Sequence, residues 1–241
     1  MNGEMTMPAI SATGKDVGNK PGDKSVKSSS LREVLASLEK SYPGAPAEEL
    51  DFFVVVILGA ITPENFAAFR RLRDGFSDWN EVRVARMVEL AKLLEPLPEP
   101  DALAFRLRAA LNKLFELRGA MDLAFLLDMR ISEARRRICG LDKQFTRQTA
   151  DYILSAIVPT VAPPLSDAAI QAARRYGLLP ARENVRWFQH RMREDLKPVE
   201  AARLAFLLTL AETARQRPAP VSPARPRRKR PAGKAKSRKR T

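Results

Sequence analysis

The sequence predicts an all-helical fold for the central part of this 241-residue chain. Apolar residues recur there every three or four positions, which is the spacing that gives one face of a helix. Residue pairs typical of helix N-termini, such as Ser30 with Glu33, precede several of these periodic segments. No segment alternates apolar and polar residues in the manner of a β-strand. These observations predict a helical domain over residues 30–215, flanked by segments of different composition.

The helices of the first half follow from their caps and breakers. The second of them ends in the run FFVVVILGAI, which is apolar all round. A strand there would have no partner, so we expect a fully buried helix over residues 47–61. Thr62 as N-cap and Pro63 at the first position then begin the next helix. In chain order, the predicted helices of this half begin near Ser30, Ala47, Thr62, Asp78, Met87 and Asp101, and the last ends at Gly119.

The second half contains a predicted hairpin of two helices. The segment RRRICGLDKQFTRQTADYIL, residues 135–154, indicates a helix, a tight connection and a second helix capped by Thr146. Ser166 and Asp167 cap a later helix that ends at Gly177. The remaining predicted helices of this half cover about residues 122–128, 132–138, 182–195 and 198–214.

Positive charge is concentrated near the C-terminus. Of the net charge of +14, +11 lies in residues 217–241 and +1 in residues 1–29, which leaves +2 for the central part. Both ends are predicted to be disordered from their composition. Cations without opposing acids attract polyanions through counterion release, so nucleic acid is the expected partner of this tail. A solubility tail and a nuclear-import signal stay open as alternatives. The predicted tail contacts are Arg227, Arg228, Lys229 and Arg230.

Several classes of protein are excluded by composition. Cys139 is the only cysteine, so an internal disulfide and a four-thiolate iron–sulfur cluster are excluded. His190 is the only histidine, so no metal site and no cofactor are expected. The longest apolar run, residues 52–61, is half a membrane span, and the N-terminus lacks an apolar signal core. We therefore expect a soluble, intracellular protein.

The order of features along residues 31–214 resembles that of a known family. A buried helix ends in ILGAITPEN and is followed by FSDWNEV. Further along the chain, TADYIL follows a glycine-containing turn. A proline-rich link, a capped helix ending in RRYGL and a last apolar helix then complete the order. This order is similar to that of the helix-hairpin-helix DNA glycosylases of the endonuclease III type. The resemblance implies a two-lobed fold, a base-excision-repair scaffold, double-stranded DNA as partner and a monomeric protein in the cytoplasm or nucleoid, or in the nucleus of a eukaryote.

The family's pattern also implies where a site would lie. In the family, hairpin glycines bring backbone amides to a DNA phosphate, a lysine beside the hairpin attacks the sugar, and an aspartate begins a later helix. Anchored on TAD, residues 149–151, the pattern places Gln148 at the lysine position; anchored on residues 138–141, it places Gln144 there. Lys143, next to Gln144, would fall on the lysine position only if the second alignment were shifted by one residue. The aspartate position falls on Ser166, with Asp167 one residue later.

Three functions therefore remain open from the sequence. The first is a DNA-binding protein with reduced or absent lyase activity, and the second is a DNA N-glycosylase that uses Asp167 to activate water. A helical protein-interaction module is the third, favoured by the nearly neutral central part. Asp167 is alternatively an ordinary helix cap, and Lys143 a phosphate contact or a surface residue. The predicted DNA contacts of the hairpin are Gly140, Lys143, Gln144, Thr146, Arg147 and Gln148.

Overall fold

A computed structural model describes residues 30–216, and within them every regular element is helical, as predicted. The predicted disordered ends, together with the tail contacts at residues 227–230, lie outside the described residues. In chain order the helices are α1 (Leu31–Ser41), α2 (Glu49–Leu58), α3 (Pro63–Gly75), α4 (Trp79–Val84), α5 (Met87–Leu94), α6 (Pro100–Arg118), the short 3-10 turn η1 (Ala124–Leu126), α7 (Ile131–Leu141), α8 (Arg147–Ser155), α9 (Asp167–Arg175), α10 (Val185–Asp195) and α11 (Pro198–Gln216).

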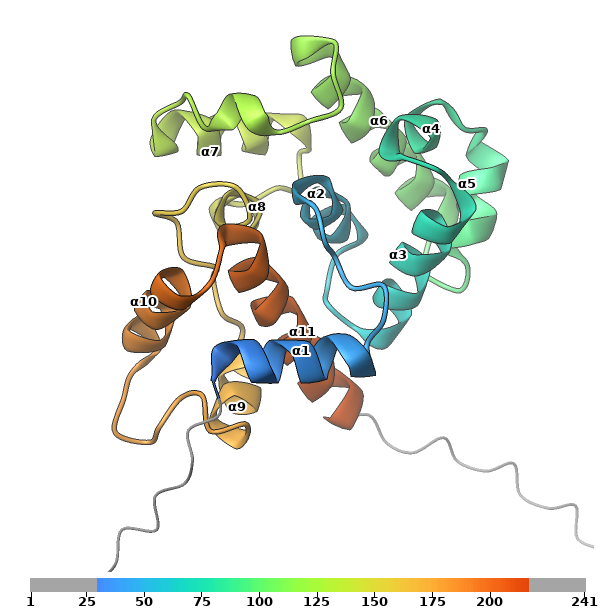
Figure 1. The fold of residues 1–241 in the computed structure, drawn as a ribbon. Helices are drawn as coiled ribbons and strands as arrows, with labels where there is room; N and C mark the ends of the chain where they lie inside the picture. Colours follow the sequence, from blue (N-terminus) through green and yellow to red (C-terminus); the bar gives the residue numbers. More distant parts are fainter. Residues whose placement is uncertain (1–29, 217–241) are drawn as a thin grey trace, which may run out of the picture.

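The helices form two lobes (Figure 1). In the first lobe, α2 packs against α3, α6 and α8, while α4 and α5 pack against α6. In the second, α1, α9 and α10 surround the long α11. Contacts of α11 with α3 and α8 join the lobes. None of the helices in residues 30–216 is long and apolar enough to cross a membrane.

The helix α2 is buried along its apolar run, as its composition predicts. Its first turn carries a buried carboxylate, Asp51, whose Oδ2 accepts the backbone amides of Ala47 and Glu48 at 2.7 and 3.1 Å. The other oxygen accepts the indole N–H of Trp79 at 3.0 Å and lies 3.3 Å from the guanidinium of Arg73. Because both oxygens are bonded, this carboxylate can be buried and fixes the start of α2 against α3 and α4.

Two polar contacts fasten the buried helix α11 to its lobe. Arg203 pairs with Glu39 of α1, with 2.7 Å between nitrogen and oxygen. Near the other end, the buried carboxylate of Glu212 accepts hydrogen bonds from Arg215, at 2.7 Å, and from Arg175 of α9. The hydrogen bond from Arg215 holds the pKa of Glu212 below its usual value; burial opposes this effect and Arg175 adds to it. The carboxylate therefore joins α9 to α11.

Several helix boundaries differ from prediction, and three of these differences are the following. The helix α2 ends at Leu58, short of its predicted end, because Gly59 has a φ of 100°, outside the helical region. The helix α6 begins at Pro100 rather than Asp101, since proline suits the first helical position. The helix predicted over residues 122–128 is reduced to η1.

Candidate functional site

The predicted hairpin is formed by α7, a turn over residues 142–146, and α8. Arg135 of α7 and Asp151 of α8 form an ion pair at 2.6 Å that holds the two helices together. Thr146 caps α8, as predicted, since its hydroxyl accepts the amide of Thr149 at 3.2 Å. The hairpin therefore has a defined connection and a fixed angle between its helices.

A buried carboxylate closes the turn of the hairpin. Asp142 is only 7% exposed, and its Oδ1 accepts the amide of Gln144 at 2.7 Å. Its backbone carbonyl accepts the amide of Phe145 at 3.1 Å. The amide of Thr146 donates to the hydroxyl of Thr149 at 2.7 Å. Three amides of the turn are thus bonded internally and are not available to hold a phosphate.

Gly140 lies outside this turn, which corrects its predicted role as the glycine of the hairpin. The helix α7 continues past it to Leu141, because Ile138 and Leu141 are both buried on one face of the helix. Gly140 does not have a positive φ, and a Cβ built on it would meet nothing within 4 Å. No strained or close backbone approach therefore requires glycine at this position.

The other predicted hairpin contacts fall into two groups. Lys143 and Arg147 are exposed, and Arg147 lies 4.0 Å from Asp151. Lys143 forms no hydrogen bond or ion pair with another described residue. Gln144 and Gln148 are exposed as well, and they line a cavity beside the hairpin. The hairpin thus carries cations on its outer side and neutral amides on its cavity side.

The cavity lies where the two lobes meet and has a volume of about 540 Å³. Its walls come from α2, the loop of residues 59–62, α6, the hairpin turn, α8, the start of α9 and α11. Val55, Val56 and Tyr152 contribute apolar surface, while hydroxyl and amide side chains supply most of the polar surface. No aspartate, glutamate or lysine is among the lining residues of the described part. The cavity therefore lacks an amine nucleophile and a carboxylate base.

Ser166 faces this cavity, whereas Asp167 does not line it. Ser166 is the N-cap of α9, and its Oγ accepts the amide of Ala169 at 3.1 Å. It also lies 3.0 Å from the hydroxyl of Thr209, which itself donates to the carbonyl of Ala205 at 2.9 Å. Ser166 must therefore donate its proton to Thr209. Both hydrogen-bonding functions of the serine are used structurally, and Asp167 is exposed at the first residue of α9.

Among the lining residues within 30–216, Arg106 is the only one with a charged side chain, and no pattern in the sequence singled it out. Its Nε donates to Oδ2 of Asp142 at 2.8 Å, so α6 is bonded to the hairpin turn. Arg106 lies in an ordinary amphipathic helix, far from Asp142 in sequence. Nothing local distinguishes it from the other arginines of α6, and only the tertiary contact reveals it.

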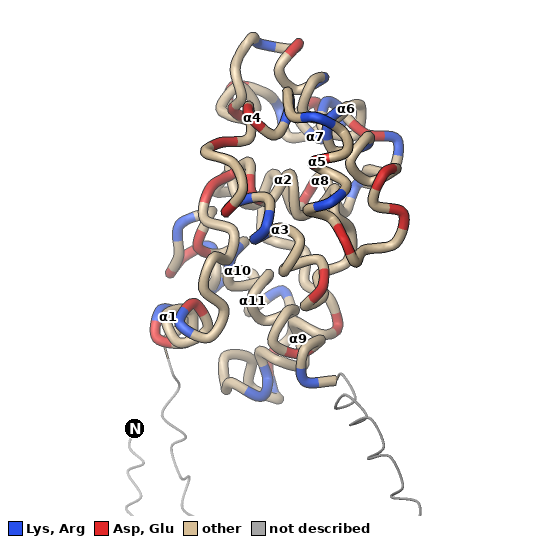
Figure 2. Tube along the Cα trace, turned by 90° about the vertical axis from the view of Figure 1, so that its right-hand side faces the viewer, with Lys and Arg blue, Asp and Glu red and all other residues tan. Residues whose placement is uncertain are grey.

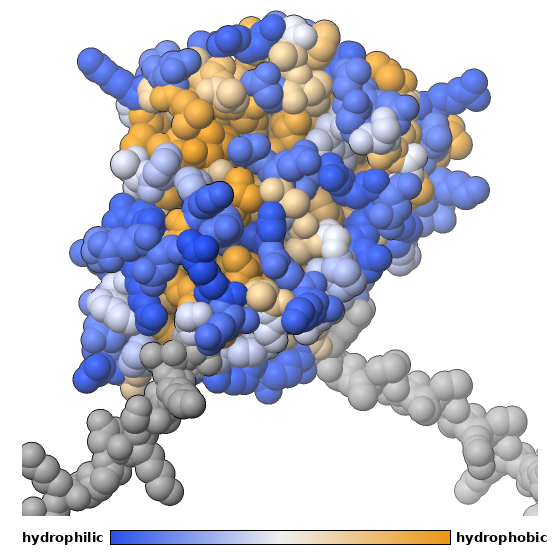
Figure 3. Space-filling view, in the orientation of Figure 1, coloured by the Kyte–Doolittle hydropathy of each residue, from blue (hydrophilic) through white to orange (hydrophobic). Residues whose placement is uncertain are grey.

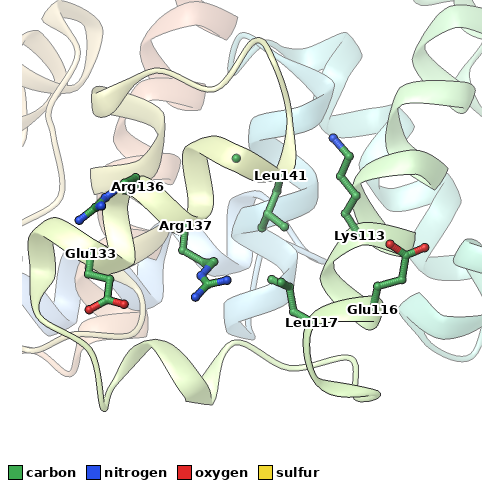
Figure 4. Close-up of a pocket in the computed structure, with 8 residues that line it drawn as sticks. Lys113, Glu116, Leu117, Glu133, Arg136, Arg137 and Leu141 are labelled. Atoms are coloured by element: carbon green, nitrogen blue, oxygen red, sulfur yellow. The ribbon is translucent and has the colours of Figure 1, made fainter.

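A second hollow, also of about 540 Å³, lies between α6 and α7 on the outside of the hairpin (Figure 4). Leu117 and Leu141 supply its apolar surface. Its charged residues are Lys113, Glu116, Glu133, Arg136 and Arg137. Because acids and bases alternate around it, this hollow has no strong potential of either sign.

The described part of the chain does not concentrate its charge on one lobe. Figure 2 shows basic and acidic residues interspersed along the helices of both lobes. Apolar side chains reach the surface in the upper part of the molecule, around α6 and α7 (Figure 3). Leu127, in the segment between α6 and α7, and Ile131, the first residue of α7, are exposed apolar residues. The helical body thus contributes little long-range attraction for a polyanion.

The two residue types most often found in metal sites are each represented once in the chain. The Nε2 atom of His190 lies 3.1 Å from the carboxylate of Glu194, and Nδ1 lies 3.3 Å from Arg193. The thiol of Cys139 donates to the carbonyl of Thr146 at 3.6 Å, across the hairpin. Within residues 30–216, no group of three or more His, Cys, Asp and Glu residues could hold a metal ion.

The fold has counterparts among solved structures. No protein-family model matches the chain, and no curated protein matches its sequence. Among solved structures, the chain is similar to endonuclease III in a trapped covalent intermediate with DNA, an estranged-adenine complex. The TM-score is 0.41 and the identity 13%, over 74% of this chain and 83% of the endonuclease III chain.

Proposed function

We propose that this protein binds double-stranded DNA and holds one unpaired base in the cavity beside the hairpin, without releasing the base or cleaving the strand. The observation that carries the proposal is the placement of Gln148 and Ser166. Both line the cavity. In the endonuclease III-like sequence pattern the aspartate position falls on Ser166, and the lysine position falls on Gln148 or, by the other anchoring, on Gln144, which lines the cavity as well. The chain thus retains a cavity and a hairpin while replacing the two reactive groups by neutral ones.

Contact with the duplex is assigned to side chains rather than to backbone amides. Lys143 and Arg147 are exposed on the hairpin, and the amides of Gln144 and Phe145 are bonded to Asp142. Cations on an exposed tip position a protein on the DNA backbone without reading its sequence. The basic residues of 217–241 add a longer-range attraction, since eleven cations there are unopposed by acids. Binding is therefore expected to depend steeply on salt.

The absence of chemistry follows from the lining groups. Excision of a base needs a nucleophile or a base that activates water near the sugar. Among the described lining residues, Arg106 is the only charged one, and it is bonded to Asp142. The proton of Ser166 is donated to Thr209, so this hydroxyl has no neighbouring base to activate it. The cavity is thus suited to binding and not to proton transfer.

The polarity of the cavity suits a nucleobase. A base outside the stack needs apolar contacts for its faces and hydrogen-bonding groups for its edges. Phe145 and Tyr152 provide aromatic surface, and the side-chain amides of Gln144 and Gln148 each provide a donor and an acceptor. Extrusion costs least for a base that is already mismatched or unpaired. We therefore propose that the protein prefers DNA with a mispaired or unpaired base, as a monomer in the nucleoid or nucleus.

The test is a panel of labelled duplexes that are fully matched, mismatched, bulged, abasic or damaged at one base. Fluorescence anisotropy measures binding, and gel analysis with and without alkali measures base release and strand cleavage. Binding that is tighter at unpaired sites and accompanied by no release supports the proposal. Ala168→Phe, which fills the cavity wall, is expected to abolish the preference for unpaired sites. Gly140→Ala, at an open position outside the cavity, serves as the matched control.

Two other outcomes would favour the remaining functions. Base release that disappears in Asp167→Asn would establish a monofunctional glycosylase and contradict the proposal. Failure to bind any duplex at low salt would favour a protein-interaction module, because the apolar surface around α6 and α7 would then be the main candidate for an interface. Both results are obtained from the same panel.

A further inference from the structure

Arg106 and Asp142 form a hydrogen-bonded unit at the wall of the cavity. Arg106 Nε donates to Asp142 Oδ2 at 2.8 Å, and Asp142 Oδ1 accepts the amide of Gln144 at 2.7 Å. The two side chains are 22% and 7% exposed, so the pair is largely removed from water. A guanidinium held through Nε by a carboxylate, which is itself held by the backbone, has little freedom to change its orientation.

The unit leaves two nitrogens of Arg106, a residue that lines the cavity, without a hydrogen-bond partner among the described residues. The terminal NH1 and NH2 nitrogens of Arg106 form no hydrogen bond with another described residue. Because Arg106 lines the cavity, these nitrogens are its strongest donors toward a ligand. Asp142 balances the charge of the guanidinium, so a neutral ligand with acceptor atoms is favoured over an anion, which would lie close to the carboxylate.

We infer that Arg106 selects the base held in the cavity by donating to two adjacent acceptor atoms; this inference rests on the proposed function. Two parallel N–H groups match an edge with two neighbouring acceptors, as when arginine binds O6 and N7 of guanine. Cytosine offers a similar pair, O2 and N3. Adenine does not, because the N6 amino group, a donor, lies beside both N1 and N7. Thymine does not, because the N3–H donor lies between O2 and O4. The protein is therefore expected to prefer an unpaired guanine or cytosine.

Asp142 has a positioning role in this arrangement, because it touches Arg106 and the backbone of the turn and does not line the cavity. Its carboxylate accepts the hydrogen bond from Nε of Arg106, so the terminal nitrogens NH1 and NH2 remain to donate to the ligand. Lysine at position 106 would keep the charge but lose the two parallel donors. The lysine variant therefore distinguishes a role of Arg106 that depends only on its positive charge from one that depends on its two parallel donors to the edge of the base.

The experiment uses four duplexes that differ only in a single bulged base, A, C, G or T, at constant salt. For the wild-type protein we expect about ten-fold tighter binding to the G or C bulge than to the A and T bulges, the discrimination of one bidentate pair. Arg106→Lys and the double variant Arg106→Met with Asp142→Asn are expected to bind all four bulges alike. The double variant avoids an unpaired buried carboxylate, and circular dichroism confirms that each variant is folded.

Arg108→Met is the matched control. Arg108 lies on the same helix and donates to the carbonyl of Ala85 at 3.5 Å, but it does not line the cavity. This variant should retain the wild-type order of preference. Equal wild-type affinity for all four bulges, or an unchanged preference in the double variant, would overturn the inference and leave the proposed function intact. No binding to any duplex would instead reject the proposed function.

Discussion

Gln148, the second residue of α8, and Ser166, the N-cap of α9, line the same cavity from two different helices. Neither side chain is an amine that could form an imine with an abasic sugar, since one is an amide and the other a hydroxyl bonded to Thr209. The cavity thus presents an amide and a hydroxyl at these two positions, and the proposed function can be tested by introducing a reactive group at one of them.

Gln148→Lys is expected to gain a covalent reaction with an abasic site. The introduced amine would condense with the sugar aldehyde, with loss of water, and borohydride would reduce the resulting imine to a stable amine. A trapped protein–DNA band should form with Gln148→Lys and not with wild type. Arg147→Lys, an exposed neighbouring substitution outside the cavity, is the control. Equal trapping by all three proteins would show that the cavity does not receive the sugar.

Removal of residues 217–241 is expected to weaken duplex binding and to flatten its dependence on salt. Each lost phosphate contact lowers the slope of log affinity against log salt by roughly 0.9. Eleven cations are removed, so a decrease of several units is expected. Removal of residues 1–29, which carry a net charge of +1, provides the control and should change the slope by one unit or less. An unchanged slope after the C-terminal deletion would exclude the tail from the DNA contact.

Asp142→Asn is expected to lower the free energy of unfolding by roughly 2–3 kcal/mol, because it leaves the guanidinium of Arg106 without its charged partner in a largely buried site. Urea denaturation measures the effect. Asp167→Asn removes an exposed carboxylate at the start of α9 and is expected to cost about 0.5 kcal/mol or less, through the helix dipole. Similar losses for both variants would mean that the Arg106–Asp142 contact contributes little to stability.

Glu212→Gln is expected to lower stability more at neutral pH than in acid. The pKa of Glu212 is lowered below its ordinary value of 4.5 in the folded protein, so its stabilising contribution is complete above 4.5 and is lost as the pH falls through the folded-state pKa. At pH 7 the loss should be about 1–3 kcal/mol, as for hydrogen bonds to a charged group. Denaturation midpoints at pH 7 and pH 3 test this, with the exposed Glu116→Gln as control. A difference that is constant with pH would argue against the linkage.

Features of the fold that depend on neighbouring residues could be predicted from the sequence. Thr62 and Asp78 cap the helices that follow them, as their residue types indicate. The burial of α2 follows from a composition without any polar face. The end of α2 was less predictable, because glycine occurs both inside and after helices and only the structure shows the positive φ of Gly59.

The site was predictable only where it depends on order along the chain. The hairpin and Thr146 were located from local signals, but Gly140 was assigned to the turn although burial of Leu141 extends α7 past it. The choice between Ser166 and Asp167 depends on which side of α9 faces the other lobe, and a one-residue difference rotates a helical side chain by about 100°. Arg106 was missed because its partner is distant in sequence.

The internal closure of the hairpin turn has a consequence for the kinetics of recognition. The carboxylate of Asp142 accepts the amide of Gln144, so hydrogen bonds within the turn support its conformation in the absence of a ligand. A loop that orders on contact loses roughly 1–2 kcal/mol of conformational entropy per residue. The present turn avoids that loss and should dock as a rigid body. Encounter would then be governed by diffusion and by long-range attraction, and complex lifetime by the fit of the cavity.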